Sequence, residues 1–189
     1  MDQNFPNNEL KILNCQIREA YGKVLYTQVC HEKISERLTS RNGNIKIAQI
    51  ILSALTTCGF IASLSIPEKW ASSIGLVFST VLLILNSYAK GFDLISLSKE
   101  HQLAANKLWK IREEYISLLA DFTLLEYCEV LQKRDDLQTR THKAYLESPR
   151  TDRKSYKEAQ RALKLENEQS FSDSEIDSLL PQALRRPLN

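Results

Sequence analysis

Two histidines and two arginines outside the long apolar segment are the residues whose types best suit recognition of a small charged ligand. His31 and His101 each fall on the inner face of a helical pattern, where a histidine is usually a hydrogen-bonded core residue and less often a ligand or a proton sensor. Arg18 and Arg112, with Tyr115, could bind an anionic signal between the same two helices. They could equally form structural ion pairs with their acidic neighbours, which are Glu19, Glu113 and Asp121. Both interpretations stay open.

Catalytic chemistry is not indicated by any motif. The sequence has no GxSxG, no HExxH and no glycine-rich phosphate loop, and it holds only five glycines. The cysteines form no CxxC pair and no Cys/His metal spacing, and small apolar side chains in a reducing compartment are their expected role; they are Cys15, Cys30, Cys58 and Cys128. We expect a protein that is not an enzyme and that holds no metal or cofactor.

An apolar segment in the first half of the chain dominates the architecture. Between Lys46 and Lys90 the only charged residues are the neighbours Glu68 and Lys69. They divide the segment into residues 47–66 and 70–88, and about 20 apolar residues span the roughly 30 Å of a bilayer's hydrocarbon core as a helix. Pro67 ends the first helix and forces a tight return. A buried hairpin in a soluble protein would need more core than this polar remainder of the chain supplies, so residues 45–89 predict a transmembrane hairpin.

Small and polar side chains follow one face of each predicted span. In the second span they recur at 3-4-3-4 spacing, at Ser72, Gly75, Ser79, Leu82 and Asn86; the first span holds Ser53, Thr56, Thr57, Gly59 and Ser63. Such faces usually allow close helix packing and hydrogen bonding between spans. Alternatively, they would line a water-filled path when several hairpins assemble.

Basic residues flank the outer ends of the hairpin, at Arg37, Arg41, Lys46 and Lys90, while the turn has only Lys69. The positive-inside tendency therefore places both termini in the cytoplasm. We expect no signal peptide, because residues 1–44 are charged throughout. The formal net charge of +2 is too small to favour direct nucleic-acid binding.

The rest of the chain predicts an all-α protein whose cytoplasmic helices pack as a coiled-coil-like bundle. Residues 1–44 would form an amphipathic helix from Glu9 to Thr39 that a breaker or cap at residues 40–44 terminates; its apolar face holds Leu10, Leu13, Ile17, Tyr21, Val24, His31 and Leu38. Residues 90–133 would continue from the hairpin with little interruption. They carry a heptad seam of Leu97, His101, Ala104, Leu108, Ile111, Tyr115, Leu118, Phe122 and Leu125. The seam could pair with the first helix or between subunits.

The charged tail, residues 134–189, would be partly disordered or would dock a partner. A helix is expected near residues 152–167, and a capping start at Ser172 precedes a Pro181 stop. Its basic excess is typical of a solvated face or of attraction to anionic lipid.

The ordered set of motifs around the hairpin resembles the SMODS and SLOG-associating two-transmembrane effector family, SLATT, over about residues 10–130. The resemblance rests on IREAYG at residues 17–22, AQIILSALT at 48–56, YAKGFDL at 88–94, His101 with Ala104-Ala105, and LWKIREEY at 108–115. It implies a bacterial inner-membrane effector of antiphage defence that causes abortive infection. Such an effector oligomerises and forms a pore or disrupts the membrane when a nucleotide signal or a partner protein triggers it.

The resemblance also implies partners. These are membrane lipid, further copies of the chain, and a sensor encoded in the same operon, either a nucleotide cyclase or polymerase or a reverse transcriptase, with a cyclic nucleotide as one conceivable ligand. The alternative is a membrane-anchored coiled-coil scaffold that recruits such a partner. A receptor subunit is the weakest option, because the outer turn is too short to hold a ligand.

Overall fold

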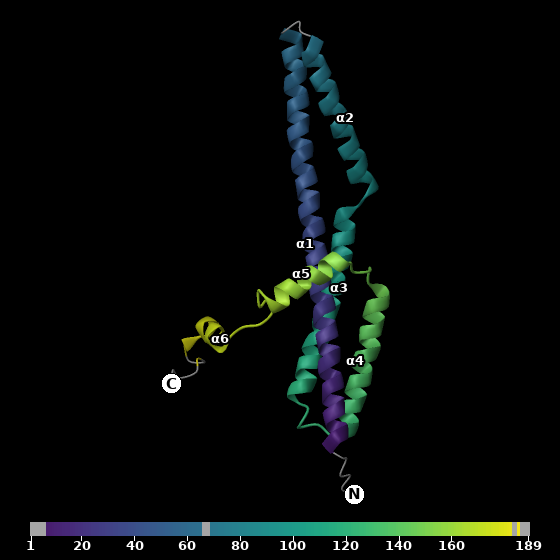
Figure 1. Ribbon diagram of the computed structural model, residues 1–189, viewed down its shortest axis with the longest axis vertical. Helices are drawn as coiled ribbons and strands as arrows, with labels where there is room; N and C mark the ends of the chain where they lie inside the picture. Colours follow the sequence, from purple (N-terminus) through teal and green to yellow (C-terminus); the bar gives the residue numbers. More distant parts are fainter. Residues whose placement is uncertain (1–6, 66–68, 183–184, 186–189) are drawn as a thin grey trace.

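The computed structural model describes residues 7–65, 69–182 and 185, of which residues 7, 62–65 and 69–72 are described in their backbone alone. Over these residues the protein is helical and contains no strand. The helices are α1 (Asn7–Ser65), α2 (Lys69–Gly91), α3 (Leu94–Ala120), α4 (Tyr127–Glu147), α5 (Arg153–Lys164) and α6 (Asp173–Leu179). Figure 1 shows a long hairpin with a helical bundle around its lower half. The all-α prediction is confirmed.

Helix α1 runs unbroken through 59 residues, a length of about 90 Å at 1.5 Å per residue. The predicted breaker at Ser40–Asn44 is therefore wrong. A glycine in a helix interior costs only about 1 kcal/mol, and Gly43 keeps a negative φ. Packing on both sides of Gly43 outweighs that cost, since Thr39 before it contacts Ser98 of α3 and Ile45 after it is half-buried.

The upper part of α1 and the whole of α2 form the predicted hairpin. Two helical stretches are long and apolar enough to cross a membrane, and none of the apolar window in either is buried. A core helix of a soluble protein would be covered instead, so the two spans belong to a membrane protein. The backbones approach at Gly59 and Gly75, as small residues permit. The turn at Pro67 and the Trp70 ring lie outside the described residues.

A short break separates α2 from α3 where the sequence predicted near continuity. Asp93 caps α3 by accepting a hydrogen bond from the Ser96 N–H at 2.8 Å. Beside the break, the Tyr88 ring lies against Phe92, with ring centroids 4.8 Å apart, and under the Arg41 guanidinium at 5.4 Å. Because the axis changes direction here, the distance between α2 and α1 increases from the turn of the hairpin to the break before α3 (Figure 1).

Helix α3 packs antiparallel against α1 of the same chain, so the heptad seam pairs within the subunit. From His101 to Leu118 each seam residue is buried, whereas Leu97 is 39% exposed. The seam ends early because α3 stops at Ala120, and Phe122 and Leu125 follow in the loop. On α1, buried Leu13, Ile17, Val24 and His31 meet this seam, while Leu10, Tyr21 and Leu38 are half-buried.

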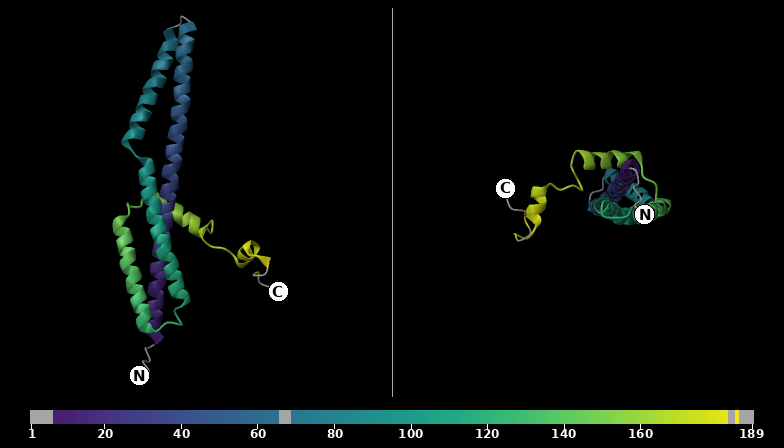
Figure 2. Two further views of the ribbon diagram at one scale, coloured as in Figure 1. Left: turned by 180° about the vertical axis from the view of Figure 1, so that it is seen from behind. Right: turned by 90° about the horizontal axis from the view of Figure 1, so that it is seen from below.

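The charged tail is more ordered than predicted. Helix α4 packs along α3, α5 crosses α1, and α6 projects sideways (Figure 2). Arg140 of the tail pairs with Glu114 of the bundle, while acidic tail residues pair with basic bundle residues, as Glu158 does with Arg37, so ion pairs of both directions hold the tail to the bundle. The expected helix near residues 152–167 is α5, and Ser172 caps α6 as predicted.

Candidate functional site at the junction of three helices

A buried histidine pair joins α1 to α3. The Nδ1 atoms of His31 and His101 are 2.8 Å apart, and the two residues are 2% and 3% exposed. One ring must donate its N–H while the other accepts with a lone pair, which requires at least one neutral imidazole. The sequence predicted both residues on inner helix faces, and the structure brings them into direct contact.

Burial favours the neutral form of both rings. It lowers the pKa of His31 to about 4, and the charge of His101 adds to this effect. Burial also lowers the pKa of His101, together with Arg37, while the carboxylates of Glu100 and Asp152 oppose the change. The pair is therefore neutral near pH 7, and its protonation would place charge inside the helix contact.

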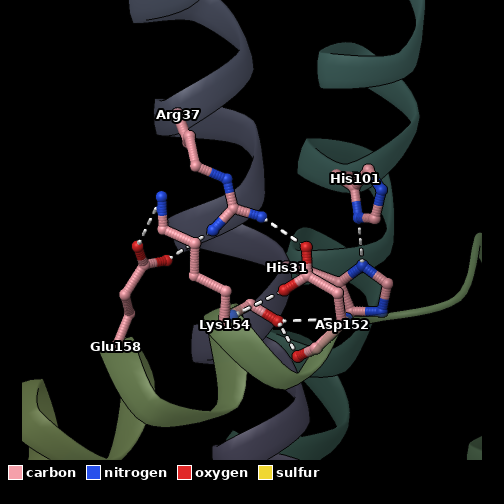
Figure 3. A network of polar contacts seen from close by, with 7 residues as sticks. His31, Arg37, His101, Asp152, Lys154 and Glu158 are labelled. Atoms are coloured by element: carbon pink, nitrogen blue, oxygen red, sulfur yellow. Dashed lines mark hydrogen bonds and ion pairs between the residues drawn. The ribbon is translucent and has the colours of Figure 1, made fainter.

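An arginine clamp beside the histidines attaches α5 to α1. The Arg37 guanidinium donates to Asp152 at 2.6 Å and to Glu158 at 2.7 Å, and Lys154 lies 3.9 Å from Glu158. Figure 3 shows this network beside His31 and His101. The Ser155 N–H, with Arg37, keeps the pKa of Asp152 below its usual value, so the clamp stays charged at neutral pH. The sequence indicates Arg37 only as one of the basic residues that set the orientation in the membrane. Its ion pair with α5 could not be predicted, because the partner Asp152 is 115 residues away.

Apolar and aromatic contacts complete the docking of α5. Buried Val29 and Cys30 of α1 meet Ala159 and Ala162 of α5. The Tyr26 and Tyr156 rings stack, with centroids 5.7 Å apart. Beyond the end of α5, Lys33 donates to Glu168 at 3.0 Å. The small alanines let α5 cross closely over α1, so α5 acts as a strap across the helix that leads into the membrane.

The α1–α3 contact turns polar on its way to the membrane. Gln28 is fully buried, and its Oε1 is the one buried side-chain N or O atom without a partner in the described part of the chain. Past the histidine pair, Ser98 contacts both Ser35 and Thr39 at 2.9 Å. A buried polar atom without a partner, such as Gln28 Oε1, costs about 1–3 kcal/mol, because it has lost its hydrogen bonds to water. This stretch of the seam is therefore easier to open than the apolar layers below it.

The remaining candidate sensing residues do not gather at one site. Arg112 is 9% exposed and donates to Gln169 at 2.8 Å and to Glu113 at 2.6 Å. It lies about 16 Å along α3 from His101. Arg18 is exposed on α1. Of the two interpretations, Arg112 follows the ion-pair one.

A cleft of about 400 Å³ opens beside His31. Thr27 and His31 of α1 line it from one side, and Tyr145 and Arg150 from the other. Its guanidinium, hydroxyl and imidazole groups could bind a small anion. No group of three or more His, Cys, Asp or Glu residues suited to a metal ion occurs among the residues that the structure describes.

In the membrane hairpin, most of the predicted stripe lies between the spans. Thr56, Gly75 and Ser79 are half-buried, whereas Ser53 and Asn86 are exposed and line an open crevice of about 820 Å³ at the bundle end of the hairpin. Gln49, which the sequence did not single out, donates to Asn86 across the crevice at 2.9 Å. The side chains of Ser63 and Ser72 lie outside the described residues. Whether the stripe lines a pore stays a prediction.

Comparison with known proteins identifies the family. No curated protein and no solved structure matches the chain. A family model, SMODS and SLOG-associating 2TM effector domain family 4, matches residues 13–175, which include both spans, the histidine pair and the strap. The chain therefore belongs to this SLATT family and is a membrane effector of antiphage defence.

Proposed function

We propose that the protein assembles in the bacterial inner membrane and permeabilises it when a nucleotide signal or a partner protein releases its cytoplasmic bundle. A single hairpin encloses no lumen, so conduction requires several copies. Both termini lie in the cytoplasm in this proposal, which follows from the basic residues at the outer ends of the hairpin.

The observation that carries the proposal is the crevice between the spans, which holds polar side chains among apolar ones. Lys46, Gln49, Ser53 and Asn86 open toward it, although each lies within or beside a stretch that is otherwise apolar. Polar groups inside a membrane are costly and commonly mark a path for water or ions. A further copy that packs against this side would enclose the crevice.

The junction of α1, α3 and α5 supports a coupling role. Helix α1 is continuous from this junction into the first span, so a rotation or tilt at His31 reaches Gln49 without an intervening hinge. The strap formed by α5 holds α1 through Arg37. A ligand in the cleft beside His31, or a partner that displaces α5, would therefore act on the spans directly.

Membrane potential in growing bacteria tests the pore. With the protein induced together with its neighbouring sensor gene, a voltage-sensitive dye should report depolarisation. Ser79→Leu and Asn86→Leu should reduce it, because they remove polar groups from the contact between the spans. Thr80→Leu and Ser87→Leu are matched controls at the same depths; both residues are exposed and neither lines the crevice, so depolarisation should be unchanged. If the Ser79→Leu and Asn86→Leu variants reach the membrane in the same amount as the original protein and still depolarise it fully, the stripe is not part of the mechanism.

The scaffold alternative draws on α6, which extends from the bundle with no buried residue. In that case the hairpin would only anchor the bundle. Replacement of residues 47–88 by an unrelated two-span hairpin separates the two functions: a scaffold keeps its protective activity against phage, whereas a pore former loses it.

A further inference from the structure

The antiparallel pair of α1 and α3 has two lateral grooves, and α4 fills one of them. Helix α4 reaches α1 through the hydrogen bond of Arg134 to Gln16, and it reaches α3 through the ion pairs of Lys107 with Glu147 and of Arg140 with Glu114. All these contacts lie on one side of the buried seam. At 100° per residue, the opposite flank of each helix turns toward the second groove.

The second groove is formed by two strips in register. On α1 the strip is Lys11, Asn14, Arg18 and Tyr21, and on α3 it is Trp109 and Ile116. Arg112 lies between these two α3 residues, but it is 9% exposed and is bonded to Gln169 of its own chain. The contact of His31 with His101 sets the antiparallel register, which places Tyr21 level with Arg112. Trp109 is 51% and Ile116 is 41% exposed.

The groove deepens at the end of the bundle that lies far from the membrane. There a cleft of about 610 Å³ is lined by Lys11, Asn14 and Leu10 of α1 and by Phe122 and Thr123 after α3. The second groove thus combines apolar side chains, which are Leu10, Phe122, Trp109 and Ile116, with two cations on its α1 rim, Lys11 and Arg18. It has the features of a site for an amphipathic helix with acidic flanks.

Helix α6 has those features. Ile176 and Leu179, 38% and 76% exposed, lie one turn apart on the same face. Asp173, Glu175 and Asp177 stand to either side of that face. An exposed apolar helix face on a projecting arm indicates a contact that a single copy does not complete.

The linker before α6 is fixed to its own bundle at Lys33 and Arg112. Asn167 and Gln169 adopt left-handed backbone conformations, with φ values of 52° and 69°. Glu168 is held by Lys33, and Gln169 by Arg112. Helix α6 therefore lies beside the bundle, level with α4 (Figure 2). A neighbouring copy in the same bilayer has its groove at the same height.

We propose that α6 of one copy docks in the second groove of the next copy, with Ile176 and Leu179 over Ile116 and the acidic residues toward Lys11 and Arg18. This contact joins two different surfaces, so each copy can both give and receive an arm. Such head-to-tail contacts form a ring when the rotation from copy to copy closes, and an open filament when it does not. The inference rests on the proposed function, to which it adds the assembly contact around a pore.

Disulfide trapping between two versions of the full-length protein tests the arm exchange. Both versions carry Cys15→Ser, Cys58→Ser and Cys128→Ser, which remove the exposed cysteines. One version adds Ile116→Cys and the other adds Leu179→Cys, with different affinity tags, and the two are co-expressed and oxidised in native membranes. A covalent pair that carries both tags is expected. Leu146→Cys, on the exposed face of α4, replaces Ile116→Cys as the control and should give no such pair.

Charge reversal in the groove adds a second measurement. Lys11→Glu with Arg18→Glu should abolish the covalent pair, while Lys143→Glu on α4, 75% exposed, should leave it intact. A third version carries both Ile116→Cys and Leu179→Cys; if its disulfide forms only within one chain, the inference is overturned. Equal trapping with the Leu146→Cys control would also overturn it. Membrane depolarisation is scored separately. Depolarisation without trapping rejects the arm exchange alone, and trapping without depolarisation rejects the pore alone.

Discussion

The two halves of the α1–α3 contact differ in chemistry. Far from the membrane, Leu13, Ile17 and Val24 pack against Leu108 and Tyr115 in a mainly apolar core. Near the membrane the same helices meet through histidine and hydroxyl groups, and α5 is clamped alongside. The apolar half fixes which helices pair and in what register, whereas the polar half leaves the contact that leads to the spans adjustable.

The largest effect is expected in the apolar half. Leu108→Ala removes a fully buried side chain and should lower the free energy of unfolding by about 3 kcal/mol. Leu103→Ala, on the same helix but 61% exposed, should change it by less than about 0.5 kcal/mol. Thermal unfolding of the full-length protein in detergent, followed by circular dichroism, measures both. Equal shifts would show that the apolar half does not hold the bundle together.

The polar half should make stability depend on pH. The folded pKa of His31, about 4, is below the usual value of 6.5, so the unfolded chain binds the proton first as pH falls. The contribution of neutral His31 to the free energy of unfolding is therefore complete above pH 6.5 and is lost as pH falls toward 4. Because one pKa unit corresponds to about 1.4 kcal/mol, the loss approaches about 3 kcal/mol.

Melting temperature between pH 7.5 and 4.5 measures this dependence. The double variant His31→Leu with His101→Leu should flatten the profile in that range, because it removes both buried titrating groups together. His142→Gln, on the exposed face of α4, is the control and should keep the slope. An unchanged slope in the double variant would assign the pH dependence to other groups.

The smallest effect is expected at the strap. Arg37→Met keeps the length of the side chain but removes its ion pairs with Asp152 and Glu158. The cost should be about 1.5 kcal/mol and confined to α5, where amide hydrogens should exchange about tenfold faster. Arg161→Met loses only an exposed pair with Glu166 and should leave the exchange near the original rate. Faster exchange throughout the bundle would mean that the strap is part of the core.

The sequence alone determined the hairpin and the pairing surfaces, because both depend on local composition. The transfer of apolar side chains from water into lipid is nearly additive along a span, so the apolar run of residues 47–88 sufficed. Heptad spacing likewise revealed that His101, Leu108 and Tyr115 share a face, and it placed His31 on the opposing one.

Only the tertiary structure decided what these surfaces meet. In the folded protein α1 continues through Ser40–Asn44, and His31 contacts His101. Arg37 pairs with Asp152, and α6 projects away from its own bundle (Figure 2). Each of these outcomes depends on which distant residue becomes a neighbour, and that choice is made by the packing of the whole bundle. Spacing along the chain carries the preference of a residue for burial or for water, whereas the identity of its partner is fixed only when the helices come together.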